Sequence, residues 1–195
     1  GAAVAVGPIV AMVGAVKKLS DTAESLTLVA NGVGATREQV QIARQAFDNM
    51  GLSAEAADKV LQFLVKNVGE GDKELAKLGV TSRNGYEALI QFANAATRAG
   101  DSATVMDLAA KALGRSGKEV SGALAGMSEA LSQTDRAMAR TGALISDDLA
   151  KKLADFDAAW EQLTITVQGA WTQMVAATVD GATTIINALS ASVTV

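Results

Sequence analysis

The clearest structural signal in the chain is residues 146–174, which read SDDLAKKLADFDAAWEQLTITVQGAWTQM. Apolar residues recur here at alternating steps of four and three: Leu149, Leu153, Phe156, Trp160, Leu163, Val167, Ala170 and Met174. A mean spacing of 3.5 residues is typical of a coiled-coil seam, whereas a globular helix has a wider apolar face. Asp147 and Asp148 favour a helix N-terminus, where carboxylates stabilise the helix dipole. We therefore predict a helix over residues 146–195, about 75 Å long at 1.5 Å per residue. Its seam mediates self-association, or else the helix folds back on the preceding ones.

Residues 36–145 predict a string of short capped helices with little strand signal. Thr36 and Gln39 have the spacing of a capping box, and Ser53 and Asp72 stand where further helices begin. A weaker repeat of the same steps ends this segment: Val120, Leu124, Met127, Leu131, Thr134, Met138, Thr141 and Ile145. We predict an all-α fold, an elongated series of helices that ends in a coiled-coil-like, self-associating helix. Its parts are residues 1–35, residues 36–145 and residues 146–195.

Ser116 and Glu119 form a second predicted capping box. The same turn offers Gly114, Arg115, Gly117 and Lys118, which could instead bind an anion at a helix N-terminus. The turn lacks the Walker pattern of a nucleotide-binding loop. A structural cap is the favoured interpretation.

The two ends of the chain are almost free of charge. Residues 1–16 contain no charged residue and stop at Lys17 and Lys18, and from Gln162 to Val195 the only charge is Asp180. The candidate membrane-contacting residues at the first end are Val4, Val6, Ile9, Val10, Met12 and Val13. Sixteen residues fall short of the roughly 17–25 that a membrane-spanning helix needs. Three interpretations stay open: the end of a span that starts upstream, a helix buried against copies of itself, and insertion at a membrane interface.

The composition argues against most enzyme classes. The 195 residues include no histidine and no cysteine, and 17 basic residues stand against 21 acidic ones. The commonest general base, thiol nucleophiles and the usual zinc ligands are therefore missing, and a net charge of -4 disfavours nucleic-acid binding. Glu70 and Glu74 could pair as acid and base, but neighbouring lysines favour an ion-paired surface. We expect no enzyme activity, no cofactor and no metal site.

Two blocks of sequence resemble the tail tape measure proteins of long-tailed bacteriophages and their prophage relatives. The first is residues 107–124, DLAAKALGRSGKEVSGAL, where a helix ending in leucine meets a glycine-arginine-x-glycine turn and a further glycine. The second is residues 142–149, GALISDDL, followed by Phe156, Trp160 and Leu163. The resemblance covers about residues 36–170 and concerns pattern and order. Because members of that family are far longer, it implies a fragment of such a protein or a short relative from a gene-transfer particle.

The resemblance implies a mechanical function. Such proteins set the length of the tail tube, fill its lumen and leave ahead of the DNA to help the genome cross the host membrane. The expected partners are further copies in a homotrimer or hexamer, the tail tube, the tail-tip (distal tail or hub) proteins and the host membrane, with DNA only as the following cargo. The expected location is the tube lumen near the tip of the virion tail, and the host cell envelope during infection. The alternatives are a membrane-inserting, pore-forming or holin-like helical protein, and an enzyme or adaptor with a carboxylate cleft.

Overall fold

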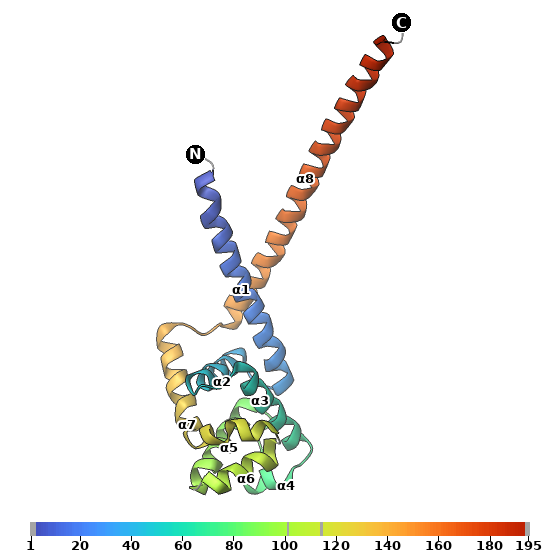
Figure 1. Ribbon diagram of the computed structural model, residues 1–195. Coiled ribbons are helices and arrows are strands. Elements are labelled where there is room, and N and C mark those ends of the chain that lie inside the picture. The colour runs from blue at the N-terminus through green and yellow to red at the C-terminus, as the bar shows by residue number, and fades with distance from the viewer. Residues whose placement is uncertain (1–2, 101, 114, 194–195) are drawn as a thin grey trace. The chain divides into compact units, whose positions relative to one another are not determined.

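The computed structural model describes residues 3–100, 102–113 and 115–193, and over these residues the chain is helical without any strand (Figure 1). The helices are α1 (Ala3–Val33), α2 (Arg37–Asn49), α3 (Ala54–Gly69), α4 (Lys73–Lys77), α5 (Gly85–Ala99), α6 (Ser102–Leu113), α7 (Arg115–Thr141) and α8 (Asp147–Val193). The predicted all-α class is confirmed. The chain divides into two compact units, residues 1–150 and residues 151–195.

The helix starts follow the capping residues of the sequence. The Thr36 hydroxyl accepts a hydrogen bond from the Gln39 amide N–H at 3.2 Å, and the Gln39 side chain accepts one from the Thr36 N–H at 2.9 Å, which confirms the capping box. Ser53 and Asp72 cap α3 and α4 as predicted. Asn84 caps α5 by accepting from the Glu87 N–H, a cap that the sequence patterns did not predict. Each cap satisfies backbone donors that a helix end would otherwise leave unpaired.

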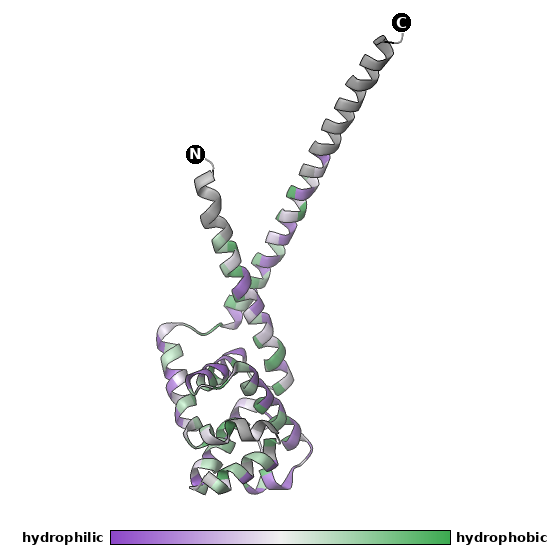
Figure 2. Cartoon of the chain, in the orientation of Figure 1, coloured by the Kyte–Doolittle hydropathy of each residue, from purple (hydrophilic) through white to green (hydrophobic). Residues whose placement is uncertain are grey.

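The core of the first unit is built from the inner faces of α1, α2, α3, α5, α6 and α7. Its largest fully buried side chains include Phe47, Leu61, Leu64, Leu89 and Phe92. Alanines such as Ala43, Ala57 and Ala93 are also fully buried, so the helices approach one another closely. Figure 2 shows hydrophobic and hydrophilic residues interspersed along the described parts of these helices.

The weaker apolar repeat of the sequence forms part of this core. On α7, six of its members are buried within the first unit: Val120, Leu124, Met127, Leu131, Thr134 and Met138. The hydroxyl of Thr134 accepts a hydrogen bond from the Asn49 amide of α2 at 3.2 Å. The repeat on α7 therefore serves packing inside one chain.

A polar cluster joins α1, α2 and α3. The guanidinium of Arg44 donates two hydrogen bonds to the carboxylate of Asp58, at 2.9 and 2.8 Å, and a third to the Ser25 hydroxyl at 3.1 Å. The side chains of Arg44 and Asp58 are each 18% exposed. Paired, two-point geometry of this kind is the arrangement that offsets the desolvation of buried charges.

Candidate functional site

The strongest candidate site is the apolar seam of α8, the face that carries Phe156, Trp160, Leu163 and Val167. These four side chains are 38%, 37%, 52% and 47% exposed, respectively. Leu149 is also exposed, Leu153 is buried, and the side chain of Met174 lies outside the described residues. Because each step along the seam is three or four residues, the four exposed side chains share one helix face. Large apolar groups exposed in a row on a helix mark an interaction surface.

The seam contains a pre-formed aromatic pair. The rings of Phe156 and Trp160 stack with their centroids 6.3 Å apart and their planes 9° from parallel. The centroid distance exceeds the spacing of a face-to-face sandwich, so the rings are offset, as aromatic pairs prefer. Two rigid rings presented together provide a large contact area, and little side-chain entropy is lost when a partner covers them.

Threonines on α8 satisfy their hydroxyl groups within the helix. Thr164, Thr166 and Thr172 each donate to the carbonyl oxygen four residues earlier, at 2.9, 2.8 and 2.9 Å. A threonine bonded in this way presents its methyl group without an unpaired donor. The hydroxyl groups of these three threonines are therefore already satisfied without a water molecule.

The candidate membrane residues lie on α1. Val4, Val6, Ile9 and Val10 belong to this helix, but their side chains are outside the described residues. Met12 is exposed and Val13 is half-buried. Within the described part of the chain, no helix combines the length and the apolarity that a membrane crossing needs.

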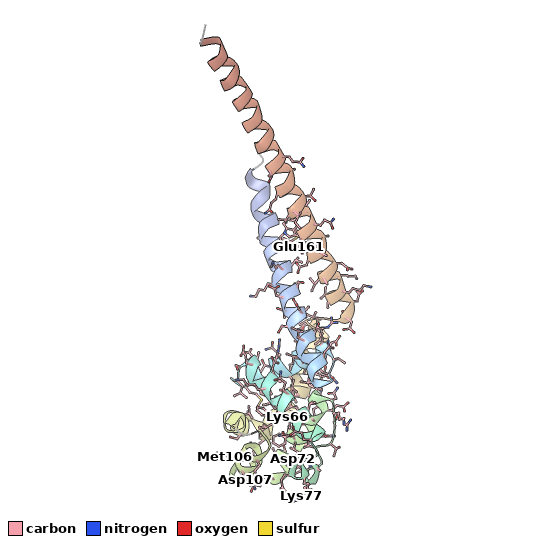
Figure 3. All side chains as sticks on the ribbon, turned by 90° about the vertical axis from the view of Figure 1, so that its right-hand side faces the viewer. Lys66, Asp72, Lys77, Met106, Asp107 and Glu161 are labelled. Carbon is pink, nitrogen blue, oxygen red and sulfur yellow. The ribbon has the colours of Figure 1, made fainter. Side chains whose placement is uncertain are left out.

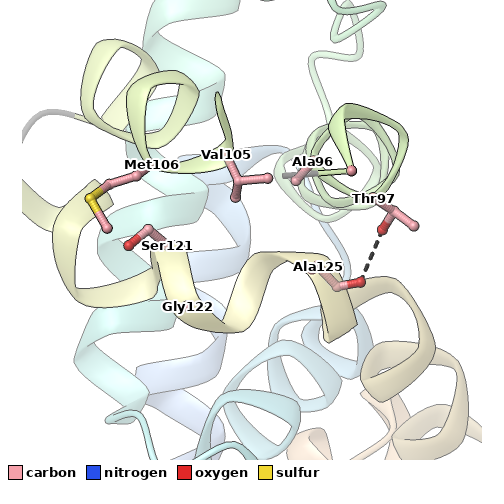
Figure 4. Close-up of a pocket in the computed structure, with 8 residues that line it drawn as sticks. Ala96, Thr97, Val105, Met106, Ser121, Gly122 and Ala125 are labelled. Carbon is pink, nitrogen blue, oxygen red and sulfur yellow. Dashed lines mark hydrogen bonds between the residues drawn. The ribbon is translucent and has the colours of Figure 1, made fainter. Parts of the chain in front are cut away.

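A cavity of about 200 Å³ lies among α5, α6 and α7 (Figure 4). The described residues around it are Ala96, Thr97, Gly100, Val105, Met106, Ser121, Gly122 and Ala125. The Thr97 hydroxyl lies 3.0 Å from the carbonyl oxygens of Ala93 and Ala125, to which it donates. None of these lining residues titrates, so they offer no group for acid–base chemistry.

The carboxylates singled out in the sequence form ion pairs. Glu70 lies 4.0 Å from Lys66, and Glu74 lies 2.7 Å from Lys77. Lys66 and Lys77 are labelled in Figure 3. All four side chains are more than half exposed. Among the described residues, no three potential metal ligands cluster together. Glu70 and Glu74 therefore lie at the surface beside lysines, as the neighbouring lysines in the sequence indicated.

The turn between α6 and α7 is built around a close helix approach. A Cβ atom at Gly117 would fall on the carbonyl group of Ala109 and lie 3.0 Å from the Ala110 nitrogen. Gly117 is thus required for packing. The side chains of Arg115, Ser116, Lys118 and Glu119 lie outside the described residues, and with them the predicted capping box and the anion-binding alternative.

The electrostatic perturbations have local causes. Burial raises the pKa of the Tyr86 hydroxyl, and the carboxylate of Asp135 adds to the rise. The Lys111 ammonium donates to Asp107 at 2.6 Å, which raises the pKa of Lys111. Neither group belongs to the seam of α8.

Comparison of the chain with protein-family models, with curated proteins and with solved structures finds no match.

Proposed function

We propose that this chain is part of a phage tail tape measure protein, a helical rod that sets tail-tube length. The observation that carries the proposal is the row of exposed apolar side chains on a single long helix. α8 contains 47 residues, which corresponds to about 70 Å at 1.5 Å per residue. A ruler needs a steady length per residue, and a narrow tube needs thin helices of small residues, which the alanine and glycine content provides.

In this proposal the seam of α8 packs against the same seam of further copies. Leu149, Phe156 and Leu163 take the d positions of a heptad, and Leu153, Trp160 and Val167 take the a positions. Covering such a row removes large apolar groups from water, at about 25 cal/mol for each Å² buried. The expected assembly is a trimer or a hexamer.

Charged residues beside the seam favour a parallel arrangement of the copies. In the same heptad frame Lys152 takes a g position and Asp157, five residues later, takes the following e position. In a parallel, in-register coiled coil, a g residue of one helix faces the next e residue of its neighbour. Lys152 of one copy would therefore face Asp157 of another, with opposite charges.

The proposal also gives the rod a location and a role in genome delivery, both expected from the resemblance. The rod lies in the tube lumen near the tail tip, in contact with tube and tip proteins. It leaves ahead of the DNA and assists delivery across the host membrane. The ends of the chain, which carry almost no charge, support this last step.

Analytical ultracentrifugation of the full chain tests the assembly. We expect Trp160→Asp and Leu163→Asp to give monomers, because each places a charge in the seam. The matched control is Ile165→Asp, since Ile165 is 62% exposed on the same helix but lies on the opposite face from Leu163 and Val167. A wild-type chain that is monomeric at high micromolar concentration contradicts the proposed assembly.

Electron microscopy of tails tests the ruler. Duplicating 14 residues of α8 in the full-length gene should lengthen the tail by about 21 Å, at 1.5 Å per residue. Tails of unchanged length would contradict the proposed ruler function.

The uncharged ends favour a second candidate function, a pore-forming or holin-like protein. Such a protein would make liposomes leak as an isolated chain, whereas a tape measure segment would leave them sealed. Dye release from vesicles separates the two candidates.

A further inference from the structure

The link between α7 and α8 is held by one side chain from α2. The Gln41 amide nitrogen donates to the carbonyl oxygen of Ala143 at 2.8 Å, and the Gln41 amide oxygen accepts from the Ile145 N–H at 2.8 Å. One amide thus binds a donor and an acceptor of residues 142–146, a segment more than 100 residues away in the sequence.

The two backbone groups bound by Gln41 are groups that a helix would use. In a continuous helix the Ile145 N–H would donate to the Thr141 carbonyl, and the Ala143 carbonyl would accept from the Asp147 N–H. Gln41 therefore competes with the hydrogen bonds that would join α7 to α8.

A second contact fixes the start of α8 on the same face of α2. Arg37, one turn before Gln41, forms an ion pair with Asp147 at 3.0 Å. The Arg37 side chain is 18% exposed and the Asp147 side chain 85% exposed, so water screens this pair from the side of Asp147. Gln41, by contrast, bonds directly to two backbone groups of the link.

The residues of the link are themselves compatible with a helix. Residues 142–146 read GALIS and contain no proline. Gly142 has φ 65°, a left-handed conformation that ends α7, and the Ser146 hydroxyl caps α8 by accepting from the Leu149 N–H at 3.3 Å. Glycine and serine disfavour a helix without forbidding one, and alanine, leucine and isoleucine are good to moderate helix formers.

The apolar pattern continues across the bend. From Met138 the steps to Thr141, Ile145, Leu149 and Leu153 are 3, 4, 4 and 4 residues. Steps of three and four keep these side chains on one face if the helix is unbroken. In the bent form Ile145 is buried and Leu149 is exposed, so the two do not share one environment.

We propose that residues 142–146 form a hinge which Gln41 holds in the bent form, and that release of Gln41 joins α7 and α8 into one helix. The joined helix gains the backbone hydrogen bonds that Gln41 blocks. It also extends the apolar seam of α8 back through Ile145.

The test is Gln41→Leu in the full, isotope-labelled chain. We expect the ¹³Cα shifts of Ala143, Leu144 and Ile145 to move to helical values, while the Ile145 N–H stays protected from hydrogen exchange. The matched control is Gln45→Leu on the next turn of α2, whose side chain bonds to Asp48 and Asn49. This control should leave residues 142–146 unchanged.

Two outcomes overturn the hinge. In one, the shifts of residues 143–145 stay as in the wild type. In the other, they move to random-coil values and the Ile145 N–H loses protection by roughly tenfold, the loss expected for one hydrogen bond without replacement. Gln41→Asn provides a second variant if leucine prevents folding, because asparagine keeps the amide but is too short to reach both groups. It should shift the same three residues toward helical values, and wild-type shifts in this variant also overturn the hinge.

Discussion

Replacing Gly117 by alanine should force α6 and α7 apart. The new Cβ would lie 3.0 Å from the Ala110 nitrogen and still closer to the Ala109 carbonyl group. Carbon atoms pack at about 3.5–4.0 Å, so the two helices must separate by about 1 Å or more. The obstacle is backbone, which cannot rotate away as a side chain can. Ala109 and Leu113, which are fully buried on α6, would lose part of their packing.

The expected cost can be estimated from these contacts. Overpacking of a core costs about 1–3 kcal/mol, and a backbone obstacle belongs at the upper end of that range. Alanine regains up to about 1 kcal/mol of helix propensity relative to glycine. The net loss should be about 2 kcal/mol, which lowers Tm by roughly 4–8 °C for a domain of this size.

Gly122→Ala is the matched control for this experiment. Gly122 lies on the same helix, and a Cβ there meets no atom within 4 Å. The control should therefore raise stability by about 0.5–1 kcal/mol through helix propensity alone. Urea denaturation followed by circular dichroism measures both variants. If Gly117→Ala is as stable as Gly122→Ala, the close approach of α6 and α7 is refuted.

Two further predictions concern charge and pH. Asp58→Ala should lower the free energy of unfolding by roughly 2–3 kcal/mol, because it leaves the largely buried Arg44 without its two-point partner. Loss of the exposed Glu74 carboxylate should lower it by less than about 1 kcal/mol. Equal costs in urea denaturation would contradict the burial argument. The folded pKa of Tyr86 lies above its ordinary value of 10.0, so the stability it contributes is complete below pH 10 and is lost as the pH rises through the folded pKa. Absorbance titration of this single tyrosine should show the raised pKa, Asp135→Asn should lower it, and Tyr86→Phe should remove this part of the alkaline loss of stability.

Local signals predicted the starts of α2, α3, α4 and α8. The capping box of Thr36 and Gln39, the cap of Ser53 and the cap of Asp72 act within a few residues, so the sequence contains all the atoms involved. The cap of Asn84 was missed, although an asparagine three residues before Glu87 has the required spacing. Gly51 and Gly79, which follow α2 and α4, have positive φ, the conformation that favours glycine at a helix end.

The apolar repeat alone does not distinguish a buried helix face from an exposed one. α7 and α8 have the same steps of four and three, yet the repeat on α7 is buried inside the first unit while Phe156, Trp160, Leu163 and Val167 on α8 are exposed. Spacing identifies the face of a helix that needs a partner, and it does not identify the partner. For Glu70 and Glu74 the sequence favoured an ion-paired surface, and the structure gives the lysine partners and the distances.

Capping bonds and apolar periodicity act between residues a few positions apart, so the sequence alone specifies the helices. The tertiary structure alone decided which helix faces are covered. Only the folded chain brings Gln41 to the link at Ala143 and Ile145, Arg44 to Asp58, and Asn49 to Thr134. These contacts join helices that are separated along the chain, and their geometry depends on how whole helices pack, which no short window of sequence specifies.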